Sequence, residues 1–284
     1  MSQYISIDGV IQTEDKAHIS PLNPGFLFGE GLFETVRADA GEPFLLSEHI
    51  ARMRAGLKIL QLEPPADFDL IPSAVKKLLT TNQLVQGAAI IKLICSQNHP
   101  ISPKIDSTAS TTLIIKTTRL ELKEINQRQQ GLRAQIIPWR RNRNNPLLGL
   151  KSLNYLENRY ALQKAGYQGF DEGIFLNQEG ELCEGTFSNL FLVRKETLLT
   201  PPLKAGILPG ITRAFILKKA HSAGIKYRET KLFPNDLKSC EGAFLTSSLM
   251  HLAPLIELDQ NKFDPSQTAP LRKLLLSHFP RITA

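Results

Sequence analysis

Residues 149–155 read GLKSLNY and place Lys151 where a loop is expected to pass into a helix. The nearby residues Leu148, Leu150 and Leu153 are apolar. Burial among apolar neighbours disfavours the charged form of a lysine and leaves a nucleophilic amine, which Schiff-base chemistry requires. The alternative is a surface lysine whose aliphatic stem covers apolar side chains while its ammonium stays in water. These seven residues alone do not distinguish a reactive lysine from a surface lysine, and the distinction depends on the other segments of the chain.

A second segment, residues 181–191, reads ELCEGTFSNLF and carries Glu184. A carboxylate that faces a pyridine nitrogen keeps that nitrogen protonated, so that the ring can accept electrons from a carbanion formed on a substrate. The alternative is a turn glutamate without a chemical role.

Three further segments have groups that could bind a phosphate. Residues 208–213 read LPGITR and open a helix, whose N-terminus offers free backbone N–H groups and the positive end of the helix dipole. Residues 246–248 read TSS and add hydroxyl and N–H donors at the end of a strand. Arg52, in the segment HIAR, lies beside the apolar stripe of a helix and could grip a phosphate with two N–H groups. Each feature taken singly also has an ordinary structural explanation.

In chain order these five segments resemble the class IV aminotransferase family. The shared pattern is H-x-x-R, K-x-x-N-Y, E-G-x-x-S-N-L-F, G-I-T-R and F-L-T-S-S, within a similarity that runs from about Ile5 to Pro254. The resemblance implies fold type IV, a mixed α/β fold shared by D-amino-acid and branched-chain aminotransferases and aminodeoxychorismate lyase. We predict a smaller N-terminal α/β domain over residues 1–118 and a larger C-terminal α/β domain over residues 119–284, with pyridoxal 5'-phosphate between them.

The resemblance also implies a role for each matching residue. Lys151 forms the Schiff base with the cofactor, Glu184 pairs with the pyridine nitrogen and Arg52 holds the phosphate. Further cofactor contacts are expected from Leu208 against one face of the ring, the amides of Ile211 and Thr212, donors of Ser247 and Ser248, and Tyr155 near the ring hydroxyl.

The reaction depends on the substrate pocket rather than on the fold. Residues 26–37, FLFGEGLFETVR, look most like the lyase branch of the family, which converts 4-amino-4-deoxychorismate to 4-aminobenzoate and pyruvate for folate synthesis. The resemblance then implies that Lys151 removes the proton from the carbon that bears nitrogen, and that Thr35 helps to protonate the leaving group. The alternative is an aminotransferase acting on D-amino acids or branched-chain amino acids. A protein that only stores the cofactor would need neither Lys151 nor Glu184 in these roles.

One segment departs from the family pattern. After the strand expected over residues 90–95, many relatives carry an S-R-G type loop, in which D-amino-acid aminotransferases place an arginine and a histidine that bind the substrate carboxylate. Here residues 96–102 read SQNHPIS, without the arginine. Arg37, Lys92 and the basic cluster Arg140–Arg143 are the alternatives for binding a dicarboxylate, and the sequence does not choose among them.

Composition limits the protein class. The chain has 284 residues, of which 42% are hydrophobic, enough for two domains that each bury a core. Three scattered cysteines without a C-x-x-C pair predict neither a disulfide framework nor a metal site, and favour a reducing, cytoplasmic setting. We expect no signal peptide, because the N-terminus lacks a basic start followed by an apolar run, and no membrane span. The net charge of +7 comes without a nucleic-acid motif, so we expect no nucleic-acid partner. The family resemblance implies a small-molecule amine substrate and a homodimer.

Periodicity and turn signals predict the main elements. We expect a hairpin over residues 4–12 with its turn at Asp8-Gly9, a helix over 48–60 with Ser47 as its N-cap, and a loop over the basic residues 139–143. The helix after Lys151 is expected over residues 152–164, ended by Gly166. The remaining expectations are strands near 32–36, 88–95, 111–116, 132–138, 173–176, 189–193 and 242–245, and helices near 211–222 and 270–277.

Overall fold

The computed structural model describes residues 3–98 and 111–280, which form two compact units. The first unit contains the described residues up to Glu121, together with Leu150–Tyr155 and Pro280. The second contains Leu122–Gly149 and Leu156–Phe279. The boundary follows shortly after the predicted division between residues 118 and 119. The lysine segment groups with the first unit, although the chain on both sides of it belongs to the second.

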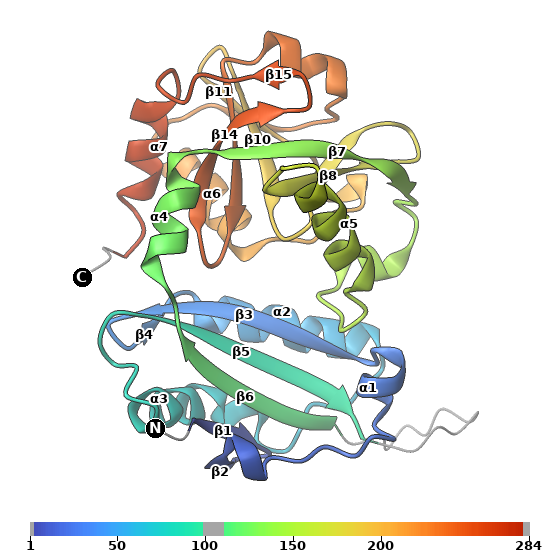
Figure 1. Cartoon of the computed structure of the whole chain (residues 1–284), viewed down its shortest axis with the longest axis vertical. Coiled ribbons are helices and arrows are strands. Elements are labelled where there is room, and N and C mark those ends of the chain that lie inside the picture. The colour runs from blue at the N-terminus through green and yellow to red at the C-terminus, as the bar shows by residue number, and fades with distance from the viewer. Residues whose placement is uncertain (1–2, 99–110, 281–284) are drawn as a thin grey trace. The chain divides into compact units, whose positions relative to one another are not determined.

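The first unit is built on an antiparallel sheet of six strands in the order β2-β1-β6-β5-β3-β4 (Figure 1). Its core lies between one face of this sheet and the helices α2 and α3, and includes Val36, Ile91, Met53 and Leu78. Because side chains alternate along a strand, the neighbouring positions of β3 and β5 point to the opposite face. The elements are β1 (Tyr4–Ile7), β2 (Val10–Thr13), α1 (Pro24–Phe28), β3 (Gly31–Asp39), β4 (Glu42–Pro43), α2 (Leu46–Ile59), α3 (Ile71–Thr81), β5 (Ala88–Gln97) and β6 (Thr111–Arg119), with short 3-10 helices at Glu14–Lys16 and Phe68–Leu70.

The predicted hairpin and the strands of this unit are confirmed, but the start of α2 is not. The helix begins at Leu46, and its N-cap is Leu45 in the left-handed conformation at φ 55. The hydroxyl of Ser47 donates instead to the carboxylate of Glu48 at 2.7 Å, so Ser47 lies inside the first turn and caps nothing.

The second unit is built on a sheet of nine strands in the order β12-β11-β10-β13-β14-β7-β8-β9, with β15 paired to β14. The strand β9 also pairs with β10, which closes six of the strands into a ring. The strands are β7 (Leu132–Arg141), β8 (Glu172–Asn177), β9 (Leu182–Gly185), β10 (Asn189–Arg194), β11 (Thr197–Thr200), β12 (Tyr227–Glu229), β13 (Gly242–Ser247), β14 (His251–Leu258) and β15 (Asn261–Lys262). The helices are α4 (Leu122–Gln130), α5 (Leu156–Tyr167), α6 (Ile211–Ser222) and α7 (Ala269–Leu276), with 3-10 helices at Pro146–Gly149, Leu203–Ala205 and Pro234–Ser239.

Two predictions about the region around Lys151 are wrong. The basic residues 139–141 are not a loop but the end of β7, where Arg140 and Arg141 pair with Leu176 and Asn177 of β8. The following helix begins at Leu156 rather than at residue 152, and it runs through Gly166. The physical reason is that Lys151 and Leu153 are hydrogen-bonded to β3 and Ser152 pairs with Leu32, so this stretch of backbone is not available for a helix. None of the helices in the described ranges is long and apolar enough to cross a membrane.

Candidate active site

The lysine segment is attached to the edge of β3 as a short extended piece. The carbonyl of Lys151 accepts a hydrogen bond from the amide of Phe33 at 2.9 Å, and the amide of Leu153 donates to the carbonyl of Gly31 at 3.0 Å. A Cβ at Gly31 would overlap the carbonyl oxygen of Cys95, so the strand needs glycine at this position. The backbone of Lys151 is therefore fixed on both sides.

Aromatic rings surround the amine of Lys151. Its Nζ lies 4.4 Å from the ring centroid of Phe33 and 5.1 Å from that of Tyr155. The two rings meet edge to face, with centroids 5.1 Å apart. The sequence had pointed to leucines as the apolar neighbours, and it gave no signal for Phe33, which is brought to the lysine only by the pairing of residues 151–153 with β3.

Arg52 is held by a buried carboxylate. Its Nε and Nη2 donate to the two oxygens of Glu34 at 2.8 and 2.7 Å, and His49 Nδ1 lies 2.7 Å from Glu34 Oε2. Burial would raise the pKa of Glu34, but the hydrogen bonds from His49 and Arg52 outweigh it and lower the pKa to about 2. The guanidinium plane of Arg52 is thus fixed by a residue that sequence reasoning did not single out, and the phosphate role of Arg52 stays a prediction.

The sheet face opposite to α2 carries the other polar candidates of the first unit. Thr35 pairs with Lys92 across β3 and β5, and Lys92 Nζ lies 5.1 Å from the ring centroid of Phe33. Arg37 lies on the same face but is buried and bonded through Nε and Nη2 to Asp39, at 2.8 to 3.1 Å. Of the predicted loop, His99–Ser102 lie outside the described residues.

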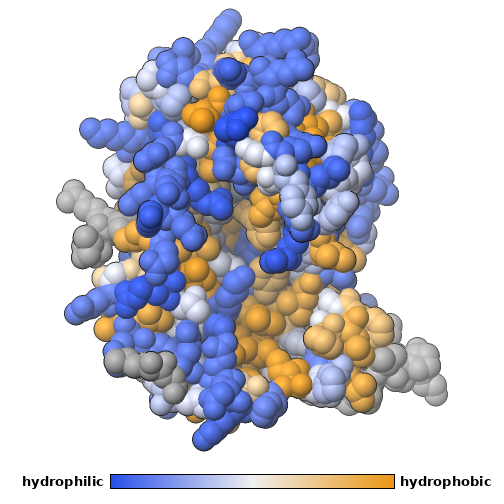
Figure 2. Space-filling view, in the orientation of Figure 1, coloured by the Kyte–Doolittle hydropathy of each residue, from blue (hydrophilic) through white to orange (hydrophobic). Residues whose placement is uncertain are grey.

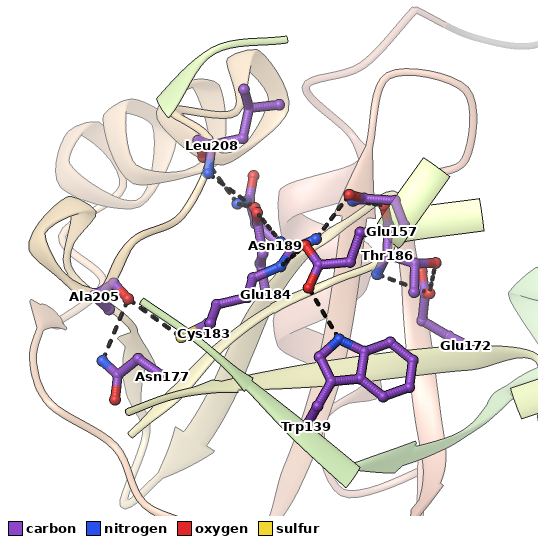
Figure 3. A network of polar contacts seen from close by, with 12 residues as sticks. Trp139, Glu157, Glu172, Asn177, Cys183, Glu184, Thr186, Asn189, Ala205 and Leu208 are labelled. Carbon is purple, nitrogen blue, oxygen red and sulfur yellow. Dashed lines mark hydrogen bonds and ion pairs between the residues drawn. The ribbon is translucent and has the colours of Figure 1, made fainter. Parts of the chain in front are cut away.

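In the second unit, Glu184 lies at the centre of a polar network (Figure 3). Its Oε2 accepts hydrogen bonds from Asn189 Nδ2 at 3.2 Å and from the amide of Leu208 at 3.0 Å. Its Oε1 lies 3.4 Å from Arg141 Nη1. Arg141 is buried and also bonds Glu157 and Asn158, at 2.9 and 2.7 Å. The sequence had assigned Arg141 to a loop, whereas the structure makes it part of the surroundings of Glu184.

The N-terminus of α6 is suited to bind an anion. Its N-cap is Gly210, and its first two residues are Ile211 and Thr212. The first turn of α6 contains no acidic side chain that would repel an anion. A Cβ at Gly210 would overlap Asn189 Oδ1, so only glycine lets the chain pass this close. Thr246 pairs with Asn189 on the neighbouring strand, and its buried hydroxyl has no hydrogen-bond partner among the described residues. The strand β13 ends at the next residue, Ser247, and Ser248 follows it.

The other basic residues of the cluster are engaged in protein contacts. Arg140 donates to the carbonyl of Gln178 at 3.1 Å. Arg143 forms ion pairs with Glu179 at 3.2 Å and Glu181 at 3.7 Å. These contacts attach the cluster to the turn that follows β8 rather than presenting it to a ligand.

The predicted site residues therefore form two groups. One group, in the first unit, consists of Thr35, Arg52, Lys151 and Tyr155. The other, in the second unit, consists of Glu184, Leu208, Ile211, Thr212, Ser247 and Ser248.

Comparison with known proteins identifies the family. The model of the amino-transferase class IV family matches residues 31–258. The chain belongs to this family. Aminodeoxychorismate lyase of Bacillus subtilis is 32% identical over 257 residues, covering 90% of this chain and 87% of that protein. D-alanine aminotransferase of Bacillus licheniformis is 26% identical, covering 95% of this chain and 93% of that protein.

Solved structures confirm the predicted mixed α/β, type IV fold. The crystal structure of a branched-chain aminotransferase from Thermoproteus uzoniensis matches with a TM-score of 0.87 and 28% identity, covering 98% of this chain and 96% of that one. The family depends on pyridoxal phosphate, which is the cofactor of this chain. The chain's own residues fit this cofactor. Lys151 has its amine beside an aromatic ring, and the carboxylate of Glu184 accepts hydrogen bonds. The N-terminus of α6 can bind an anion, and the buried hydroxyl of Thr246 has no hydrogen-bond partner among the described residues.

Proposed function

We propose that the protein is a 4-amino-4-deoxychorismate lyase, which forms 4-aminobenzoate and pyruvate. The observation that carries the proposal is that Thr35 and Phe33 point to the same face of the sheet. The amine of Lys151 lies against the ring of Phe33. Two residues along a strand separate Thr35 from Phe33 by about 7 Å. An elimination must return the abstracted proton to a departing fragment some distance from the carbon that bears nitrogen, and a hydroxyl on this face could relay it there, whereas a transamination moves a proton only between two carbons of the cofactor–substrate adduct. The similarity to the Bacillus subtilis lyase supports the same choice.

The proposed mechanism divides the work among residues of the chain. Pyridoxal phosphate, when bound, supplies an electron sink next to the substrate amine. Lys151 holds the cofactor and then takes the proton from the carbon that bears nitrogen. Glu184, oriented by Asn189, Leu208 and Arg141, keeps a proton on the ring nitrogen. The Thr35 hydroxyl gives its proton to the departing three-carbon fragment, which becomes pyruvate, and Lys151 restores the hydroxyl with the proton it took from the substrate.

Phosphate binding falls to residues of both groups. The amides of Ile211 and Thr212 and the hydroxyls of Ser247 and Ser248 supply donors, and the Arg52 guanidinium adds charge. Leu208 packs against one face of the ring, and Tyr155 approaches the ring hydroxyl. The proposal requires that both groups of residues act on the same cofactor molecule.

Lys92 is the proposed partner for a substrate carboxylate. Lys92 is exposed and shares a sheet face with Thr35 and Phe33. Arg37 lies on the same face but is buried against Asp39. The remaining candidates belong to the second unit, where Arg140 contacts Gln178, Arg141 contacts Glu157 and Arg143 contacts Glu179. The Lys92 ammonium adds a charge for an acidic substrate where the S-R-G arginine is missing.

The second candidate function is a class IV aminotransferase of D-amino acids or branched-chain amino acids. It is supported by the similarity to the D-alanine aminotransferase and to the branched-chain aminotransferase structure. This reaction uses Lys151 and Glu184 in the same way and gives Thr35 no part in proton transfer.

A paired assay separates the two functions. Purified holoenzyme is supplied with 4-amino-4-deoxychorismate while 4-aminobenzoate is measured, and a parallel sample receives an amino donor and a keto acid. The lyase proposal predicts 4-aminobenzoate, and a loss of about 100-fold or more in Thr35→Val with an unchanged cofactor spectrum. The matched control is Thr118→Val, on the same sheet face but on β6, which β5 separates from β3. Nitrogen exchange without 4-aminobenzoate would instead establish the aminotransferase.

We also propose that the protein is a homodimer. Large hydrophobic side chains are exposed on each unit, among them Phe26 at 75% and Leu156 at 79%. Figure 2 shows hydrophobic patches among the hydrophilic side chains of the visible face. Exposed apolar area of this kind is typical of protein–protein contacts. Light scattering coupled to size exclusion should give twice the chain mass of 31.7 kDa, and the mass of a single chain would contradict the proposal.

A further inference from the structure

A second glutamate, Glu172, lies beneath the turn that follows Glu184. It begins the strand β8 and is 3% exposed. Its Oε1 accepts hydrogen bonds from the amide of Gly173 at 3.0 Å, from the amide of Thr186 at 2.9 Å and from the hydroxyl of Thr186. Its Oε2 accepts from the hydroxyl of Ser188 at 2.9 Å. Four donors thus converge on one side chain that can only accept while it is ionised.

Three of the four donors belong to the tight turn between β9 and β10. The amide of Gly185 donates to the carbonyl of Ser188 at 2.7 Å and closes the turn. A Cβ at Gly185 would lie 3.0 Å from Glu172 Cδ and would overlap Ser188 Oγ, so the turn is packed directly onto the carboxyl group (Figure 3). The shape of this turn therefore depends on the acceptor beneath it.

The turn connects to the Glu184 carboxylate by two routes. Glu184 and Asn189 flank the turn, pair across β9 and β10, and share the hydrogen bond from Asn189 Nδ2 to Glu184 Oε2. On the other side, Asn158 Nδ2 donates to the carbonyl of Thr186 at 2.6 Å, while Asn158 Oδ1 accepts from Arg141, which faces Glu184 Oε1. A shift of the turn would therefore move donors on both oxygens of Glu184.

We propose that Glu172 is a positioning residue that sets the direction of the Glu184 carboxylate toward the ring nitrogen of the cofactor. The inference rests on the proposed role of Glu184. It holds for the lyase and for the aminotransferase alike, because both need a protonated ring nitrogen. Nothing on Glu172 itself touches the cofactor in this proposal.

The test is a double-mutant cycle with Glu172→Gln, Glu184→Gln and the double variant. Glutamine keeps the size of Glu172 but turns an N–H₂ group toward hydrogen-bond donors, which leaves at least one donor unsatisfied. The readouts are the dissociation constant of pyridoxal phosphate from the apoprotein and the pH midpoint of the visible band of the bound cofactor. We expect Glu172→Gln to weaken binding about tenfold and to shift the pH midpoint in the wild-type background, but to have little further effect when Glu184 is already glutamine.

The matched control is Glu241→Gln, because Glu241 also braces a turn of the same unit by accepting from the amide of Lys195 at 2.8 Å, away from the site residues. The control should change neither readout. Additive effects of Glu172→Gln and Glu184→Gln, or a change of thermal stability alone, would overturn the inference and leave the proposed function standing. A pH midpoint unmoved by Glu184→Gln would overturn both. If Glu172→Gln does not fold, Ser188→Ala, which removes one donor and keeps the carboxylate, enters the same cycle with the same two outcomes.

Discussion

Replacing Glu34 by glutamine should destabilise the first unit by an amount that the structure allows us to work out. Glu34 is 1% exposed, and its oxygens are bonded by Arg52 and approached by His49. Its pKa falls from 4.5 to about 2, because the bonds from His49 and Arg52 outweigh the effect of burial. A carboxyl group with this change in pKa contributes about 3 kcal/mol to the free energy of unfolding at neutral pH. Glu34→Gln should therefore lower that free energy by about 3 kcal/mol.

The pH dependence gives the prediction its sign. A carboxyl group whose folded pKa is depressed stabilises fully above its unfolded pKa, here 4.5, and loses this contribution as the pH falls toward about 2. Wild type and Glu34→Gln should thus differ most at neutral pH and converge between these two values. Urea denaturation followed by circular dichroism, at neutral pH and in steps down to about pH 3, measures both effects.

The matched control is Glu48→Gln on the same helix, where the side chain is exposed and bonds only its neighbour Ser47 among the contacts described. This variant should stay within about 0.5 kcal/mol of wild type. The reasoning fails if Glu34→Gln costs no more than Glu48→Gln at neutral pH. It also fails if the difference between wild type and Glu34→Gln does not shrink in acid.

Three further predictions concern ligand binding and local stability. Lys92→Ala should raise KM for the acidic substrate by about 10- to 100-fold, as expected for the loss of a charged hydrogen bond, and should leave the cofactor spectrum unchanged. The control is Lys116→Ala on the neighbouring strand β6, and equal KM values for the two variants would count against Lys92. Gly210→Ala should weaken pyridoxal phosphate binding about tenfold or more in a fluorescence titration, because the added methyl group displaces Asn189; unchanged affinity would show that the close approach is not needed. Gly166→Ala is the control for Gly210→Ala, because an added methyl group there meets open space. Since Gly166 lies within α5, this variant should raise the free energy of unfolding, measured by urea denaturation, by about 0.5–1 kcal/mol. A decrease would contradict the bounds of α5.

Local signals predicted most elements of the chain but failed where tertiary pairing decides. The Asp8-Gly9 turn and the Pro209-Gly210 helix start are short-range features, and the hairpin and α6 follow from them. The helix after Lys151 was predicted to begin at residue 152, four residues before its true start. Ser152 instead pairs with Leu32 of β3, a strand more than a hundred positions away in the chain.

The site was predictable to a similar degree. The ordered motifs singled out Lys151, Glu184 and the segments around Arg52, Gly210 and Ser247. They gave no indication of Phe33, Glu34 or Glu172, because each of these acts through residues that only the folded sheet brings to it. Arg141 was assigned to a loop for the same reason, since its partners Glu157 and Glu184 come from other elements.

The visible absorption of the bound cofactor tests the central claim most directly. Lys151, fixed beside β3 with its amine against Phe33 and Tyr155, is the residue proposed to carry pyridoxal phosphate. Wild-type protein incubated with the cofactor should show the visible Schiff-base band, and Lys92→Ala, which removes the other lysine near Phe33, should retain it. Lys151→Ala should lose the band, and its survival in that variant would show that another amine carries the cofactor.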